Sequence, residues 1–295
     1  MYKCMTEVAY MYLELPTGTV LHDKYEIIEV LGQGGFGITY LAIDLDTEKK
    51  YAIKEFFPRG CSRNKNDLVM PLAMTNSAFE SRLIGFLNEA KILLSINQEN
   101  VVKVYSYFRE NKTGYYVMEY AEGIQLGEYI NKNGPLNTKK ALNIFTEICK
   151  GIEAIHDQGY LHGDIKPENI IINENDERIK IIDFGGSFKK GSFFKINIIS
   201  KRYSAPEKFL ADSYLTPTSD IYSLGGVLFF MLSGTHPLSL EERKTIFDLS
   251  FPYGDHKTRE IIKKSMERIP EKRYKSVSVI LKKIQSSNFL SKLFS

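Results

Sequence analysis

The pattern of apolar residues changes near residue 120 of this 295-residue chain. Before that point, short stretches rich in β-branched and aromatic side chains are separated by turn-prone residues, which is typical of strands. These stretches are residues 24–31, 37–44, 50–56, 101–108 and 114–120. One helix is expected over residues 78–96, with an apolar stripe of Phe79, Leu83, Phe86, Leu87, Ala90 and Leu94. The first part of the chain is therefore predicted to be a small, mostly β lobe.

Helical periodicity dominates after residue 124. It is clearest over residues 137–159, where Asn137 can cap the start and Gly159 can close the end. The apolar face of this segment consists of Ala141, Phe145, Ile148, Ile152 and Ile155. Two short strands are expected at 169–173 and 178–184, and helices return after Ser219. The chain is thus predicted to have an α+β fold whose second lobe is mostly helical.

The length also favours two lobes over one compact core. The sequence suggests five parts: an extension (1–23), an N-terminal lobe (24–118), a connection (119–123), a C-terminal lobe (124–285) and a tail (286–295). Residues 58–77 contain many Gly, Asn, Ser and Pro residues and are expected to form a loop. Clefts between lobes commonly bind ligands.

Composition excludes several classes of protein. The 39 basic and 36 acidic residues give a net charge of +3, which argues against nucleic acid or an anionic membrane as the main partner. Three scattered cysteines are typical of a reducing compartment. The N-terminus lacks a secretion signal, and the most apolar run, residues 221–232, is too short to span a bilayer. A soluble, cytoplasmic protein without a membrane span is expected.

A glycine-rich stretch lies between the first two expected strands. Gly32, Gly34 and Gly37 follow a GxGxxG pattern, and glycine lets the backbone approach a phosphate closely. A tight hairpin turn would also need glycines. A dinucleotide-binding fold requires a helix directly after them, whereas residues 38–44 read as a strand, so that fold is disfavoured.

Lys54 lies in the next expected strand and could reach a nucleotide phosphate, although a lysine in a sheet is often only an exposed edge charge. A phosphate-binding lysine needs an acid to fix its position. Glu89 on the expected helix is the first candidate. Glu80 is the second, and it lies nearer the helix start, where an acid can simply stabilise the helix dipole.

Residues 161–173 combine charged and aliphatic side chains. Asp164 can accept a proton from an incoming hydroxyl, and Lys166 can neutralise charge on a transferring group. Asn169 and Asp183 offer oxygen ligands suited to Mg²⁺. Each residue alone reads more simply as a turn-forming polar side chain, so their combination and order carry the interpretation.

The order of these motifs resembles the signature of the protein kinase superfamily. The matching stretches are Gly32–Gly37, Ala52–Lys54, His162–Asn169, Asp183–Gly185 and Ala205–Glu207, and the resemblance runs from about Tyr25 to Tyr274. The chain is most similar to the bacterial eukaryotic-like serine/threonine kinases. This resemblance implies a bilobal kinase fold, with a five-stranded β N-lobe carrying one helix and a mostly α-helical C-lobe.

The resemblance also implies residue roles, with ATP and Mg²⁺ (or Mn²⁺) as cofactors. Lys54, paired with Glu89, would contact the α- and β-phosphates under the glycine loop, Asp164 would act as base, and Lys166 would lie near the γ-phosphate. Asn169 and Asp183 would hold the metal. The residues expected around adenine are Leu31, Thr39, Ala52, Met118, Glu119, Ala121 and Ile171.

Structural roles follow from the same resemblance. His162 and Phe184 would belong to an internal apolar spine with Leu93 and Val104 above them. Asp220 would anchor the loop that carries Asp164. Glu207 would pair with Arg273.

The sequence departs from the family pattern at several positions. Gly163 replaces an arginine that often grips a phosphorylated activation loop, so we expect activity that does not depend on such a phosphate. Ser200 keeps a hydroxyl where a threonine is usual, and Thr39 replaces a valine. Five basic residues between Asp183 and Glu207 form a solvated loop or attract acidic partners: Lys189, Lys190, Lys195, Lys201 and Arg202.

The leading hypothesis is a serine/threonine protein kinase that acts on protein substrates and also autophosphorylates. A pseudokinase or nucleotide-gated binding module is a second hypothesis, against which Lys54, Asp164, Asn169 and Asp183 all count. A small-molecule kinase is a third, disfavoured by the intact Ala205–Glu207 motif. The sequence does not specify the oligomeric state.

Overall fold

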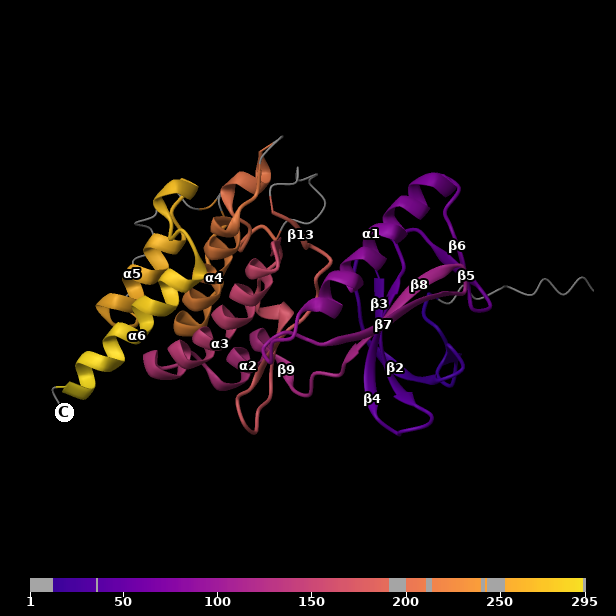
Figure 1. Cartoon of the computed structure of the whole chain (residues 1–295), viewed down its shortest axis with the longest axis horizontal. Coiled ribbons are helices and arrows are strands. Elements are labelled where there is room, and N and C mark those ends of the chain that lie inside the picture. Colours follow the sequence, from indigo (N-terminus) through magenta and orange to yellow (C-terminus); the bar gives the residue numbers. More distant parts are fainter. Residues whose placement is uncertain are drawn as a thin grey trace, which may run out of the picture. The chain divides into compact units, whose positions relative to one another are not determined.

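The computed structural model describes residues 13–35, 37–190, 200–210, 214–239, 242 and 253–293. The chain forms two compact units, drawn in Figure 1. The first consists of residues 1–95 and 103–120, and the second of residues 96–102 and 121–295. Lys195, one of the five basic residues noted between Asp183 and Glu207, lies outside the described residues.

The first unit is built on an antiparallel sheet in the order β1-β2-β3-β4-β8-β7. Its strands are β1 (Val20–Leu21), β2 (Tyr25–Gln33), β3 (Gly37–Asp44), β4 (Lys50–Phe56), β7 (Val104–Glu110) and β8 (Thr113–Glu119). The five predicted strands all form. The two-residue strand β1 adds a sixth at the edge, inside the stretch expected to be an extension.

Helix α1 (Asn76–Ser95) packs against β7 and β8 through Phe79, Leu83, Phe86, Ala90 and Leu93. The predicted stripe was wrong at Leu94, which is 42% exposed while Leu93 is buried. The buried positions repeat every three or four residues, and one further residue turns the side chain about 100° away from this face.

Residues 58–77 are not simply a loop, which corrects the sequence interpretation. Strands β5 (Ser62–Asn64) and β6 (Asp67–Val69) pair as a short antiparallel hairpin. The two strands are only three residues long, too short to show an alternating pattern. The hairpin is held to the first unit by Arg63, whose side chain is buried.

The second unit is mostly helical, and its elements are shown in Figure 1. The helices are α2 (Leu126–Asn133), α3 (Thr138–Asp157), α4 (Pro217–Ser233), α5 (His256–Ser265) and α6 (Val277–Leu293). Helix α3 packs against α4 and α6, and α4 also packs against α5. The predicted apolar face of α3 is confirmed, since all five of its residues are buried, and Asn137 caps the helix by accepting from the Lys140 amide. Helix α6 extends to Leu293, within the stretch expected to be a separate tail.

Short strands in the second unit hold the polar segments found in the sequence. Strands β9 (Ile124–Gln125), β11 (Ile170–Ile172) and β12 (Ile179–Ile181) form one small sheet, and β10 (Tyr160–Leu161) pairs with β13 (Phe188–Lys189). The 162–169 loop therefore runs from β10 to β11 and is fixed at both ends. Among the helices of the described residues, none is both long and apolar enough to cross a membrane.

Candidate functional site

Lys54 lies on the face of β4 that α1 covers. Its Nζ is 3.9 Å from Oε1 of Glu89, and both side chains are about nine-tenths buried. Glu80, the alternative partner, instead forms an ion pair of 2.5 Å with Arg109 near the surface. The structure therefore selects the first of the two acids that the sequence offered.

A tyrosine that sequence reasoning missed also contacts Glu89. The hydroxyl of Tyr116 donates to Glu89 Oε1 at 3.2 Å, and Lys54 Nζ lies 5.8 Å from the centre of the Tyr116 ring. Tyr116 is the direct cross-strand partner of Lys54 in the β4–β8 pair, so the two side chains share one face of the sheet. That register could not be read from the sequence alone.

The glycine loop joins β2 and β3. A Cβ added to Gly37 would lie 2.2 Å from the carbonyl oxygen of Glu55, so only glycine fits against β4. Gly34 donates from its amide to the Gly37 carbonyl at 2.9 Å, which closes the turn. A Cβ added to Gly32 would meet nothing within 4 Å. Packing thus requires glycine at position 37 but not at position 32.

The residues expected around adenine are divided between the two units. In the first, Ala52 pairs with Met118 across β4 and β8, and Thr39 pairs with Lys54 across β3 and β4. These cross-strand pairs place Thr39, Ala52 and Met118 on the sheet face that carries Lys54. Leu31 is 43% exposed, and the Glu119 amide is bonded to the Lys103 carbonyl. Ala121 and Ile171 belong to the second unit.

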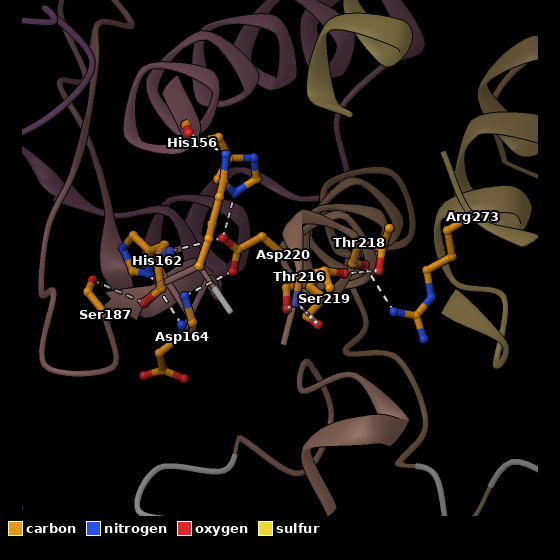
Figure 2. A network of polar contacts seen from close by, with 12 residues as sticks. His156, His162, Asp164, Ser187, Thr216, Thr218, Ser219, Asp220 and Arg273 are labelled. Atoms are coloured by element: carbon orange, nitrogen blue, oxygen red, sulfur yellow. Dashed lines mark hydrogen bonds and ion pairs between the residues drawn. The ribbon is translucent and has the colours of Figure 1, made fainter. Parts of the chain in front are cut away.

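In the second unit, Asp220 on α4 anchors the 162–169 loop, as Figure 2 shows. Its Oδ2 accepts from the His162 amide at 2.9 Å, and its Oδ1 accepts from the Gly163 amide at 2.9 Å. The role expected for Asp220 is confirmed. His156 on α3, which sequence reasoning missed, bonds Asp220 Oδ2 through Nε2 at 2.8 Å.

The Asp220 carboxylate is buried and charged. Burial would raise its pKa, but the hydrogen bond and charge of His156 and the Gly163 amide outweigh burial and lower it. This buried carboxylate holds two successive backbone amides of the loop. The direction of the following residue, Asp164, is therefore set by α4.

Asp164 is itself nearly buried and accepts three side-chain hydrogen bonds. Lys166 Nζ donates to Oδ2 at 2.7 Å, and the Asn169 amide donates to the same oxygen at 3.2 Å. The Ser200 hydroxyl donates to Oδ1 at 2.7 Å. The structure thus brings the predicted base, the predicted phosphate-neutralising lysine and one predicted metal ligand around a single carboxylate.

The predicted metal ligands lie at one end of the β11–β12 ladder. The Ile182 amide donates to the Asn169 carbonyl at 2.9 Å, and Asp183 is the next residue in the chain, just after the end of β12. The amide nitrogen of Asn169 donates to the Asp164 carbonyl at 2.8 Å, so its side-chain oxygen points the other way. An amide oxygen and a carboxylate fit a hard cation that also binds phosphate oxygens.

The segment that follows Asp183 packs on the same loop. The rings of His162 and Phe184 lie 4.8 Å apart, and burial lowers the pKa of His162, which favours a neutral imidazole. A Cβ added to Gly186 would lie 3.1 Å from Cβ of Asp164. The Ser187 hydroxyl donates to the His162 carbonyl at 3.2 Å. Leu93 and Val104, the other expected spine residues, are buried in the first unit.

The basic residues of this segment are not all simply solvated. Lys190 donates from Nζ to the His156 carbonyl, at the end of α3. Lys201 and Arg202 are exposed beside Ser200. At least one of the lysines therefore fixes the segment to the second unit.

Glu207 and Arg273 form the expected ion pair, deep in the second unit. Arg273 binds both carboxylate oxygens, with NH1–Oε1 at 2.7 Å and NH2–Oε2 at 2.8 Å. The Ser219 hydroxyl also donates to Oε1 at 2.7 Å. Arg273 further bonds the carbonyls of Thr218, Glu267 and Arg268, and Figure 2 shows its side chain beside Thr218.

Comparisons with known proteins agree with this architecture. The Protein kinase domain family matches residues 25–290. Serine/threonine-protein kinase PrkC of Bacillus subtilis is 35% identical over 233 residues, 78% of this chain and 33% of that protein. Serine/threonine-protein kinase D of Synechocystis is 29% identical over 282 residues, 90% of this chain and 52% of that protein. The chain thus spans only 33% to 52% of the length of these relatives.

Among solved structures, the PpkA-294 apo form is similar, with a TM-score of 0.77 at 23% identity over 92% of this chain and 100% of that chain. At this identity, the likeness supports the fold. The kinase fold expected from the sequence is confirmed. Because the family match extends over residues 25–290, which include both the Lys54–Glu89 pair and the 162–169 loop, this chain belongs to the protein kinase domain family.

Proposed function

We propose that this chain transfers the γ-phosphoryl group of ATP to serine or threonine hydroxyls of protein substrates, its own hydroxyls included. The observation that carries the proposal is the set of contacts around Asp164. Its carboxylate already accepts a hydrogen bond from a serine hydroxyl, that of Ser200, while Lys166 and Asn169 donate to its other oxygen. A carboxylate held in this way can orient a second hydroxyl and take its proton.

The remaining residues position charge. Lys54, held by Glu89, would bind the α- and β-phosphates, and Lys166 would neutralise charge on the γ-phosphoryl group. Asn169 and Asp183 would hold Mg²⁺, with Mn²⁺ as a substitute, and the bound metal would neutralise phosphate charge. Phosphoryl transfer needs little covalent chemistry from the protein, so positioning and neutralisation supply most of the rate.

Adenine would lie against the β4 face in the first unit. Leu31, Thr39, Ala52 and Met118 supply apolar surface there, and backbone groups of Glu119 and Ala121 would bond the base. Ile171 is the remaining residue expected to contact the base. The names of the curated relatives support a serine/threonine preference, and this chain matches 33% and 52% of the length of those relatives.

The activity is tested with labelled ATP and Mg²⁺, with and without a generic basic protein, followed by phosphoamino-acid analysis. We expect labelled serine or threonine, and a fall in kcat of about 10²- to 10⁴-fold for Asp164→Asn. Asp176→Asn, the same exchange in an exposed turn, serves as the matched control and should keep full activity. Omission of the divalent cation should abolish transfer.

The other hypotheses give different results in this experiment. A nucleotide-gated binding module would bind ATP and label neither itself nor the added protein. A small-molecule kinase would consume ATP only when a small hydroxyl compound is added. Labelled tyrosine alone would contradict the serine/threonine preference.

A further inference from the structure

Lys208 is a buried lysine that the function described so far does not use. It lies in the short helical turn η2 (Pro206–Phe209), directly after Glu207, and only 2% of its surface is exposed. Its Nζ donates to the carbonyl oxygen of Gly163 in the 162–169 loop. Burial of an ammonium is costly unless it is hydrogen-bonded and close to opposite charge.

The surroundings of Lys208 supply that opposite charge. Burial lowers the pKa of Lys208, and the negative charges of Asp164, Asp220 and Glu207 act against this change. The positive charge of Lys166 adds to the effect of burial. Lys208 is therefore a buried cation that bonds the Gly163 carbonyl and is stabilised by the charges of the base, the loop anchor and Glu207.

The local sequence does not force this lysine inside. The same tripeptide, Pro-Glu-Lys, forms the helical turn η4 (Pro270–Lys272), where both Glu271 and Lys272 are exposed. The burial of Lys208 must therefore come from its tertiary contacts. Those contacts are with the loop that carries Asp164.

Both polar groups of the Gly163 residue are bound by buried charged side chains. Its amide donates to Asp220 on α4 at 2.9 Å, and its carbonyl accepts from Lys208 on η2. Gly163 has a left-handed φ of 77° and no side chain of its own that could bring a cation to this place. The two peptide units that flank the Gly163 Cα are thus held by opposite charges: the one before it by the anion Asp220, and the Gly163–Asp164 unit by the cation Lys208.

We propose that Lys208 is a positioning residue for phosphoryl transfer, whose ammonium fixes the Gly163–Asp164 peptide and ties the segment ending at Glu207 to the 162–169 loop without a phosphate group. The inference rests on the proposed function. It adds that a lysine of the chain itself supplies a positive charge to the 162–169 loop. Because the lysine is part of the chain, the contact exists in the unphosphorylated protein. Orientation of Asp164 then depends on the cation at residue 208.

The test measures kcat and the KM for ATP in full-length Lys208→Met, Lys208→Arg and Lys208→Gln variants, after phosphatase treatment. Lys208→Met has nearly the same length but no charge, and we expect kcat to fall about 10- to 100-fold while the KM for ATP changes little. Lys208→Arg should recover part of the loss. Lys272→Met, the same exchange in the exposed Pro-Glu-Lys turn, should leave both constants unchanged. Phosphatase-treated wild-type protein should remain active.

A chemical rescue separates charge from packing. Lys208→Ala should regain activity when methylammonium or ethylammonium is added, and an equal concentration of sodium chloride should not restore it. Wild-type kcat in folded Lys208→Met or Lys208→Gln overturns the proposal, and so does failure of every alkylammonium in folded Lys208→Ala. Wild-type protein that transfers no phosphate at all contradicts the proposed function instead, so the two failures are distinguishable.

Discussion

Each unit contains a buried glutamate–arginine pair, Glu55–Arg63 in the first and Glu207–Arg273 in the second, and the two pairs are built differently. In the second unit, Arg273 binds both oxygens of Glu207. In the first, Arg63 reaches one oxygen of Glu55 at 2.5 Å, and the hydroxyls of Tyr40 and Tyr115 donate to the carboxylate at 2.8 and 3.0 Å. The Glu207 carboxylate depends mainly on Arg273, whereas the Glu55 carboxylate is bound by three donors, Arg63 and the two tyrosine hydroxyls.

The two ion pairs also support different parts of the chain. Glu207 lies next to Lys208, which contacts the 162–169 loop, so the Glu207–Arg273 pair supports the segment nearest to the chemistry. Glu55 follows Lys54 on β4, and successive strand residues point to opposite faces. Arg63 therefore fixes the β5–β6 hairpin, and through its bond to the Leu13 carbonyl also the N-terminal stretch, to the face away from Lys54. The comparison predicts that loss of the Glu207–Arg273 pair lowers both stability and activity, whereas loss of the Glu55–Arg63 pair lowers stability alone.

The largest effect is expected for Arg273→Met. This change leaves Glu207 buried without its bidentate partner and removes three further bonds to backbone carbonyls, so the free energy of unfolding should fall by about 3–5 kcal/mol. Activity per folded molecule should fall as well, because the turn that carries Lys208 loses its support. Denaturant unfolding and kcat measured below the transition check both effects.

Lys275→Met, an exposed exchange near Arg273 in the chain, is the control for this variant. Full stability of Arg273→Met would contradict the importance given to the pair. Normal stability with lost activity would assign Arg273 to catalysis rather than to support.

Arg63→Met should have a smaller effect, and on stability alone. Two tyrosine hydroxyls still donate to Glu55, so we expect the free energy of unfolding to fall by about 2–3 kcal/mol, with kcat of the folded protein nearly unchanged. The double variant Glu55→Gln, Arg63→Met should be more stable than the sum of the single changes indicates. A large loss of kcat in folded Arg63→Met would show that the two faces of β4 are coupled.

The two pairs also mark how far the sequence could predict the molecule. Periodicity predicted the strands and α3, and the family pattern predicted Glu207–Arg273 and the anchor Asp220. The β5–β6 hairpin and the burial of Arg63 escaped prediction, because a charged residue in a Gly-rich and Asn-rich stretch reads as exposed. The sixth strand, β1, was too short to give a signal.

Burial of charge is the property that sequence reasoning misses most consistently here. Lys208 and Lys272 follow the same two residues, yet one is buried and the other exposed. His156 ends an apolar stripe and could have been noticed as a polar residue on a buried face. The contact between Tyr116 and Glu89 could not have been predicted from the sequence, because it depends on the register of β4 against β8. Local sequence determines whether a turn or a strand forms, and tertiary contacts determine whether its charged side chains are buried or exposed.

The smallest effect, confined to acid pH, concerns the protonation of Glu207. Burial would raise its pKa, but the hydrogen bond and charge of Arg273 and the Ser219 hydroxyl outweigh burial and lower it from its ordinary value of 4.5. The unfolded chain therefore binds a proton at Glu207 more readily than the folded chain does. This contribution to stability is fully present above pH 4.5 and is lost as the pH falls through the lower, folded pKa.

Glu207→Gln removes that contribution, so the variant should be less stable than the wild type at neutral pH, and the difference between them should narrow as the pH falls below 4.5. Glu271→Gln, the same exchange in the exposed Pro-Glu-Lys turn, is the matched control and should track the wild type throughout. Denaturant unfolding at a series of pH values measures these differences. A stability difference between wild type and Glu207→Gln that widens in acid would mean that burial, and not Arg273, governs the pKa of this carboxylate. Glu207 would then depend less on its arginine than the tyrosine-supported Glu55 does.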